Sequence, residues 1–290
     1  MVQYLMLTLA TLLLAVDFSF NKIYQKTKGT SPASGFGFNA LLGLFTAIIF
    51  FLINGFKMDF SVFSFLMAMA VNILVMSYSI IGFKLLKSGT MAIYTMFLMS
   101  GGMILPYVFG LVFLDEQFSA LRMAGLVLIL LGVIFSNTGG GKINTKQLLM
   151  CIAVFVLNGF VSITSKLHQT QTTFRTVKTE DFVLIGGLFK FVFAGIMYLI
   201  YKNKDKQKTG DNNAFIPLVI IALSAVAGGV SYLLQLNGAM ALPASVLYPF
   251  ITGGGIVMSS LAGVIVFGDK LSKNVVVSIV LCFFGTVLFL

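Results

Sequence analysis

The chain has 290 residues, of which 58% are hydrophobic and 10% are charged, and its mean hydropathy is +1.02. Soluble domains are about 45–50% apolar and about 25% charged, so this composition excludes a soluble globular protein and indicates an integral membrane protein. The net charge of +10 comes from lysines in predicted loops, not from a compact basic face with aromatics. It therefore favours contact with anionic lipid headgroups over nucleic-acid binding.

Ten apolar runs, separated by charged or polar breaks, are each about long enough to cross a bilayer as a helix. They are expected at about residues 3–21, 34–56, 63–83, 90–114, 121–137, 148–165, 182–201, 215–236, 244–267 and 275–290. The connections between them are too short to fold as domains. Because the first run is too long for a signal-peptide core and no cleavage pattern follows it, we expect it to be a retained span.

Part of the chain is present twice, because residues 89–137 correspond to residues 242–290 at an offset of 153. The corresponding residues are Gly102 and Gly255, Pro106 and Ser259, Gly110 and Gly263, Glu116 and Asp269, and Ser119 and Ser272. Small residues four positions apart share one helix face, where they let helix backbones approach closely in a membrane. We therefore expect the first three pairs to serve helix packing or gating.

The first half of each copy corresponds at an offset of 144. Lys22 matches Lys166, Phe38 matches Phe182, and the string GLFT at 43–46 matches GLFK at 187–190. Five spans per copy are an odd number, so the second copy must enter the membrane the other way up. The predicted fold is thus an all-α membrane protein of ten transmembrane helices in two inverted five-helix repeats, residues 1–138 and 148–290, joined by a linker at 139–147. Transporters of this architecture place their site between the halves, near the midplane.

Each repeat ends in a small-residue helix, a short acidic break and a final apolar helix, the breaks reading FLDEQFS at 113–119 and VFGDKLS at 266–272. This pattern resembles the EamA-type members of the drug/metabolite transporter superfamily, whose break reads Gly, Glu, a basic residue and an apolar residue. The chain departs from it at Asp115, Gln117 and Asp269. The resemblance implies secondary transport or export of small metabolites, often amino acids or related compounds, without ATP.

The sequence lacks the residues that nucleotide binding, metal binding or enzyme catalysis would need. The Gly-Lys string TGGGKINT at 138–145 lacks the glycine and the Ser or Thr that a phosphate loop needs. Cys151, Cys282 and His168 are too few for a metal site, and the two cysteines fall inside predicted spans. We find no nucleophile set, so we expect no enzyme activity and no cofactor. We interpret His168 as a loop residue rather than a proton relay.

Two charged residues lie inside apolar spans and away from the span ends, and a charge at mid-helix costs about 2.5–3.5 kcal/mol. They are Asp17 and Lys190, and their repeat counterparts are the uncharged Val161 and Thr46. We hypothesise that both line a central cavity and face the ammonium and carboxylate of a zwitterion. A desolvated carboxylate holds protons more tightly, so protons are a candidate coupling ion. Alternatively, Asp17 is an interfacial acid, and Lys190 snorkels to the surface or forms only a structural pair with Asp17.

Further candidates for the substrate site are polar side chains in otherwise apolar spans. They are Asn72, Tyr78, Tyr94, Asn158, Tyr232, Gln235 and Tyr248. The amides among them can equally be hydrogen-bonded links between helices. Pro106, Pro243 and Pro249 introduce kinks, which are compatible either with bending during alternating access or with a static shape.

Three classes of function stay open. The first is an exporter of amino-acid-like zwitterions, and the second is a multidrug exporter of lipophilic cations, which a lysine in the cavity would disfavour. The third is a membrane-embedded enzyme or scaffold. We expect a small-molecule substrate, a lipid bilayer around a monomer or homodimer, and a bacterial plasma membrane. The excess of lysines in the loops after odd-numbered spans places both termini outside.

Overall fold

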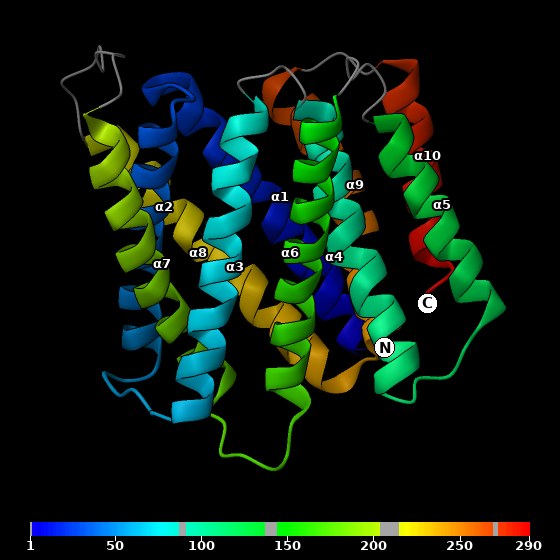
Figure 1. The fold of residues 1–290 in the computed structure, drawn as a ribbon, viewed down its shortest axis with the longest axis horizontal. Helices are drawn as coiled ribbons and strands as arrows, with labels where there is room; N and C mark the ends of the chain where they lie inside the picture. Colours follow the sequence, from blue (N-terminus) through cyan, green and yellow to red (C-terminus); the bar gives the residue numbers. More distant parts are fainter. Residues whose placement is uncertain (1, 87–90, 137–143, 204–214, 269–271) are drawn as a thin grey trace.

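In the computed structural model, the described residues are 2–86, 91–136, 144–203, 215–268 and 272–290, and all regular secondary structure among them is helical (Figure 1). The helices are α1 (Val2–Lys28), α2 (Pro32–Ile53), α3 (Val62–Leu86), α4 (Met91–Phe113), α5 (Ala120–Ser136), α6 (Thr145–Thr170), α7 (Thr179–Lys202), α8 (Phe215–Ala241), α9 (Ala244–Phe267) and α10 (Lys273–Val287).

Each predicted apolar run corresponds to one helix of the structure. Eight of the described helices are long and apolar enough to cross a membrane, which supports a multi-pass membrane protein, whereas α5 and α10 are shorter apolar helices. The predicted linker at 139–147 and Asp269 lie largely or wholly outside the described residues.

The predicted spans differ most from the structure at the ends of three helices. α1, α6 and α8 continue beyond the predicted spans to Lys28, Thr170 and Ala241. In α6 the extra turn carries Lys166 and His168, which we predicted to lie in a loop. Both are buried there, because the lysine and histidine find hydrogen-bond partners within the protein instead of in water.

Sequence-encoded caps begin several of the helices. The side chain of Ser31 accepts a hydrogen bond from the backbone of Ser34, and Pro32 follows as a first helical residue that needs no backbone donor. Asn144 and Gln147 form a reciprocal capping box at the start of α6. At the end of α9, Gly268 adopts a left-handed φ of 65°, which closes the helix at low conformational cost.

Consecutive helices run in opposite directions, so α1 and α6 are antiparallel (Figure 1). The connections α2–α3, α4–α5, α6–α7 and α8–α9 lie together at the lower end of the view in Figure 1. We call this side the lower end. The connection from α1 to α2 lies at the opposite, upper end.

Glycines allow the closest helix contacts. α2 packs on α7, where a Cβ atom added at Gly43 would lie 2.7 Å from the carbonyl oxygen of Gly187, and one at Gly187 would lie 2.9 Å from that of Gly43. α5 packs on α10 in the same manner, with Gly132 against Cys282 and Gly285 against Ile129. Gly43 corresponds to Gly187 at the offset of 144, and Gly132 and Ile129 correspond to Gly285 and Cys282 at the offset of 153, so each of these contacts is repeated by its counterpart.

Two further contacts correspond in the same way. Gly101 of α4 packs against the backbone of Phe155 in α6, and Gly254 of α9 packs against Thr11 in α1. The first glycine precedes the second by 153 positions, and Thr11 precedes Phe155 by 144. The α4–α6 and α9–α1 contacts therefore use equivalent positions of the two halves.

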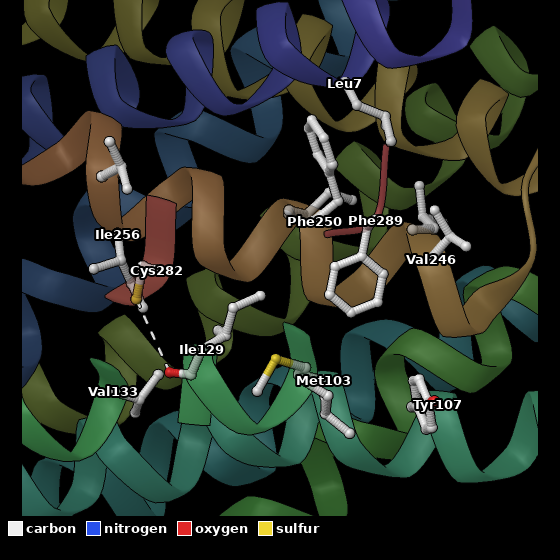
Figure 2. Close-up of a cluster of buried hydrophobic side chains, with 14 of the residues drawn as sticks. Leu7, Met103, Tyr107, Ile129, Val133, Val246, Phe250, Ile256, Cys282 and Phe289 are labelled. Atoms are coloured by element: carbon white, nitrogen blue, oxygen red, sulfur yellow. Dashed lines mark hydrogen bonds between the residues drawn. The ribbon is translucent and has the colours of Figure 1, made fainter. Parts of the chain in front are cut away.

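The largest buried apolar cluster joins α1, α4, α5, α8, α9 and α10 (Figure 2). The thiol of Cys282 in this cluster is 3.9 Å from the backbone oxygen of Ile129. Cys282 and Cys151 are both buried and free. This cluster fixes α5 and α10 to one flank of the molecule.

We predict that Gly101→Ala destabilises the fold, because the new methyl group would overlap the backbone of Phe155, which cannot move like a side chain. Overpacking typically costs about 1–3 kcal/mol. The chain has no tryptophan, so unfolding in detergent is best followed with a thiol-reactive dye that labels the two buried cysteines. Gly195→Ala is the control, since no atom lies within 4 Å of its added Cβ; equal melting temperatures for both variants would contradict the packing account.

Candidate functional site

A cavity of about 510 Å³ lies among α1, α2, α3, α4, α6, α7, α8 and α9. This volume is in the range of about 300–1,000 Å³ that is usual for small-molecule sites. Most of its lining is apolar. The polar side chains that line it are Asp17, Thr46, Asn72, Tyr78, Asn158, Ser162, Ser165, Lys190, Tyr232, Gln235, Tyr248 and Thr252.

Eight of the nine predicted substrate-site residues line this one cavity, although they come from six helices. They are Asp17, Asn72, Tyr78, Asn158, Lys190, Tyr232, Gln235 and Tyr248. The ninth, Tyr94, is not part of the lining; its ring packs against Gly82 of α3. Of the six predicted packing or gating residues, Gly102 and Gly255 line the cavity, whereas Pro106, Gly110, Ser259 and Gly263 do not.

Asp17 projects from α1 toward α8. The hydroxyl of Ser224 donates a hydrogen bond to its Oδ1 atom, and Gly228 of the same helix lies against the carboxyl group. Asp17 is half-buried. One carboxylate oxygen is thus held by α8 while the group as a whole faces the cavity.

Lys190 brings an opposite charge into the same space from α7. Within the described part of the chain, its ammonium group makes neither a hydrogen bond nor an ion pair, although it lies near enough to Asp17 for the two charges to interact. The hypothesis that the two residues form only a structural pair predicts a direct salt bridge, which the described residues lack. Two opposite charges therefore share the cavity without satisfying each other.

Polar links tie α6 to α4, α8 and α9 around the cavity. The Tyr248 hydroxyl donates to the Ser162 backbone oxygen at 2.5 Å, and the Tyr232 hydroxyl is 3.1 Å from Ser165 Oγ. Asn158 Nδ2 donates to the Leu98 backbone oxygen at 2.8 Å, so this amide is a link between α6 and α4, as one of our alternatives predicted. The Tyr78 hydroxyl, in contrast, makes no hydrogen bond among the described residues.

Two charged side chains that sequence reasoning did not assign to the site lie next to the cavity, at the lower end of the molecule. Lys166 of α6 donates from Nζ to the backbone oxygens of Ala239 and Leu242, both at 2.6 Å. Glu116 accepts from the backbone nitrogens of Ala244 and Ser245, at 2.5 and 2.9 Å. We call this arrangement the Glu116–Lys166 latch.

The latch places each charge at the helix end that favours it. The carbonyls bound by Lys166 are at the C-terminus of α8, and the N–H groups bound by Glu116 are at the N-terminus of α9, so both charges complement the helix dipoles. Ala239 also lines the cavity, so the latch lies directly below it. The sequence did carry a signal, since both residues have charged counterparts, Lys22 and Asp269.

His168 is also placed differently from our prediction. It is only 1% exposed in α6, its Nε2 atom lies 2.8 Å from Ser64 Oγ, and its ring stacks on Phe182 with centroids 3.8 Å apart. The loop interpretation is therefore wrong. His168 does not line the cavity; its contacts join α3, α6 and α7.

Comparison with known proteins supports the fold and gives no information on function. No family model and no curated protein match the sequence. Among solved structures, 28 chains match, and one, described as "Crystal structure of protein", has a TM-score of 0.74 at 16% identity, covering 99% of this chain and 95% of that one. No group of three metal-ligating side chains occurs among the described residues.

We predict that Glu116→Gln lowers the thermal stability of the protein in detergent. The amide would turn an NH₂ group toward one of two backbone donors, and a hydrogen bond to a charged group is worth about 1.5–3 kcal/mol. Asp115→Asn is the matched control, because Asp115 is exposed in the same loop and makes no hydrogen bond among the described residues. The latch would be refuted if both variants melted at the wild-type temperature.

Proposed function

We propose that this protein is a secondary transporter that exports small amino-acid-like zwitterions by alternating access. The observation that carries this proposal is the placement of Asp17 and Lys190 in one cavity of suitable size, with no salt bridge between them among the described residues. A buried charge without a partner is costly. A ligand that brings an ammonium to Asp17 and a carboxylate to Lys190 would satisfy both groups at once.

For the architecture, we propose ten transmembrane helices in two inverted repeats, as in EamA-type members of the drug/metabolite transporter superfamily. Three features support it. Helices of the two halves that correspond run in opposite directions, equivalent glycines make equivalent contacts, and the cavity lies between the halves, where inverted-repeat transporters bind their substrates. We propose the bacterial plasma membrane as its location.

The latch supports alternating access because it gives the lower end a defined way to open. Separating the α8–α9 turn from α6 and from the α4–α5 connection would break four hydrogen bonds, two made by Lys166 and two made by Glu116. All four are made by charged groups at helix ends, which water can replace when that end opens. Pro249 lies in the first part of α9, where it removes a backbone donor and permits the helix to bend.

Protons are the coupling ion that we propose. Asp17 is the acidic side chain that lines the cavity, so a proton and the substrate ammonium would compete for the same carboxylate. If the carboxylate carries the substrate in one direction and a proton in the other, the protein exchanges substrate for protons across the membrane. Lipophilic cations are the alternative cargo, but the ammonium group of Lys190 in the same cavity would repel them.

We predict that proteoliposomes containing the protein catalyse counterflow of at least one labelled neutral amino acid, and that Asp17→Asn and Lys190→Met each lower the rate at least about tenfold, since each removes a charge worth about 1.4 kcal/mol or more. Lys202→Met is the control for the lysine, because it removes an exposed charge at the end of the same helix. Transport of a lipophilic cation but of no amino acid would show that the proposed substrate class is wrong.

We also predict that the double exchange Asp17→Lys with Lys190→Asp does not restore counterflow. The exchanged charges would still attract each other, but Ser224 and Gly228 surround position 17 alone, and a lysine there cannot bind an ammonium group. Full activity in the exchanged protein, measured against both single variants, would show that the pair is structural.

A further inference from the structure

Two small residues of α8 contact the carboxylate of Asp17 and fix its position. Ser224 and Gly228 are four positions apart and therefore share the helix face that meets α1. Ser224 is completely buried, and its hydroxyl donates to Asp17 Oδ1. Gly228 lines the cavity beside the same carboxyl group.

Gly228 leaves the carboxylate just enough room. A Cβ atom at this position would lie 3.1 Å from Cγ and Oδ2 of Asp17 and 3.3 Å from Oδ1. These distances are tighter than most real Cβ contacts, so a methyl group there would displace the carboxylate by a few tenths of an ångström. Since Ser224 holds Oδ1, the displacement would strain that hydrogen bond and cover the Oδ2 side.

The other half of the protein shows that helix packing alone does not require these residues. Asp17 corresponds to Val161 at the offset of 144. The first residues of α3 and α8, Val62 and Phe215, differ by 153, and at this offset Ser224 and Gly228 correspond to Val71 and Val75. All three valines also line the cavity, and their helices α6 and α3 pack on each other as α1 and α8 do. One helix pair thus carries an acid, a donor and a glycine where the other carries three valines.

The two sets lie on different walls of the cavity. In Figure 1, α3 and α6 pass in front of α1 and α8. Asp17 offers a negative charge to a ligand from α1, whereas the three valines offer apolar surface from α3 and α6, beside polar side chains of the same two helices. A ligand that contacts both Asp17 and the valines would carry a positively charged group at one side and an apolar group at the other.

We propose that Ser224 and Gly228 are positioning residues that hold the Asp17 carboxylate as the site of a primary ammonium group, and that the three valines receive an apolar side chain. The substrate class is then a neutral amino acid with an apolar side chain. This inference rests on the proposed transport function and adds to it the residues that select the head group and the side chain.

The test is counterflow of labelled leucine at increasing concentration, with Gly228→Ala, Ser224→Ala and Ser224→Thr compared with the wild type. We expect KM to rise about tenfold for both alanine variants, equivalent to about 1.4 kcal/mol, while the maximal rate changes less than about twofold. Ser224→Thr keeps the hydroxyl and is expected to retain the wild-type KM. The control is Gly195→Ala, which adds the same methyl group to α7 away from the cavity.

The possible failures can be told apart. If the wild type exchanges no amino acid, the proposed function fails and the inference fails with it. If Asp17→Asn stops leucine exchange but both alanine variants keep the wild-type KM, the positioning roles alone are overturned. If unlabelled glutamate competes with leucine as well as unlabelled isoleucine does, the apolar wall does not select the side chain. Melting temperatures of the variants in detergent identify any that lose activity through misfolding.

Discussion

A charged side chain within an apolar helix is stable only where it meets a partner or water, and this constraint organises the molecule. Lys166 satisfies this constraint fully, because two backbone oxygens at a helix end accept its hydrogen bonds. Lys190 does not, because no described residue pairs with its ammonium group, and it faces a cavity instead. The contrast separates a charge that is fully bonded within the protein from one that faces the cavity without a partner among the described residues.

The packing of the helices around the cavity follows from their apolar surfaces. Apolar helices gain little from associating in lipid, so close approach of backbones at glycine has to supply the contact energy. The pairs α2–α7, α4–α6 and α1–α9 do this at Gly43, Gly101 and Gly254. All six of these helices contribute residues to the cavity lining. α5 and α10 lie outside the lining and pack on each other instead.

Much of the fold follows from the sequence, because each helix is a nearly uninterrupted apolar run whose ends carry charges or caps. The site was partly predictable for the same reason, since a polar residue in such a run stands out, and eight of nine candidates line the cavity. Tyr94 lies outside the lining because its ring packs against the neighbouring Gly82 instead. Lys166 and His168 were misplaced because lysine and histidine near the end of an apolar run usually face water.

Ser224 could not be recognised from its own helix, since a serine among apolar residues can bond to its own backbone. Its counterpart Val71 was the available clue, because a duplicated position that differs in polarity marks a difference in role. The substrate, the coupling ion and the inverted repeat stay predictions of the pattern, which the arrangement of charges and glycines now supports with specific contacts.

The most direct test of the central claim is competition binding to the purified protein, using labelled leucine and three unlabelled competitors: leucine, its amide, which lacks the carboxylate, and its deaminated acid, which lacks the ammonium group. If Asp17 and Lys190 each bind one end of a zwitterion, only intact leucine displaces the label at low concentration. Equal displacement by the amide would show that Lys190 does not contact the substrate, and equal displacement by the acid would show the same for Asp17.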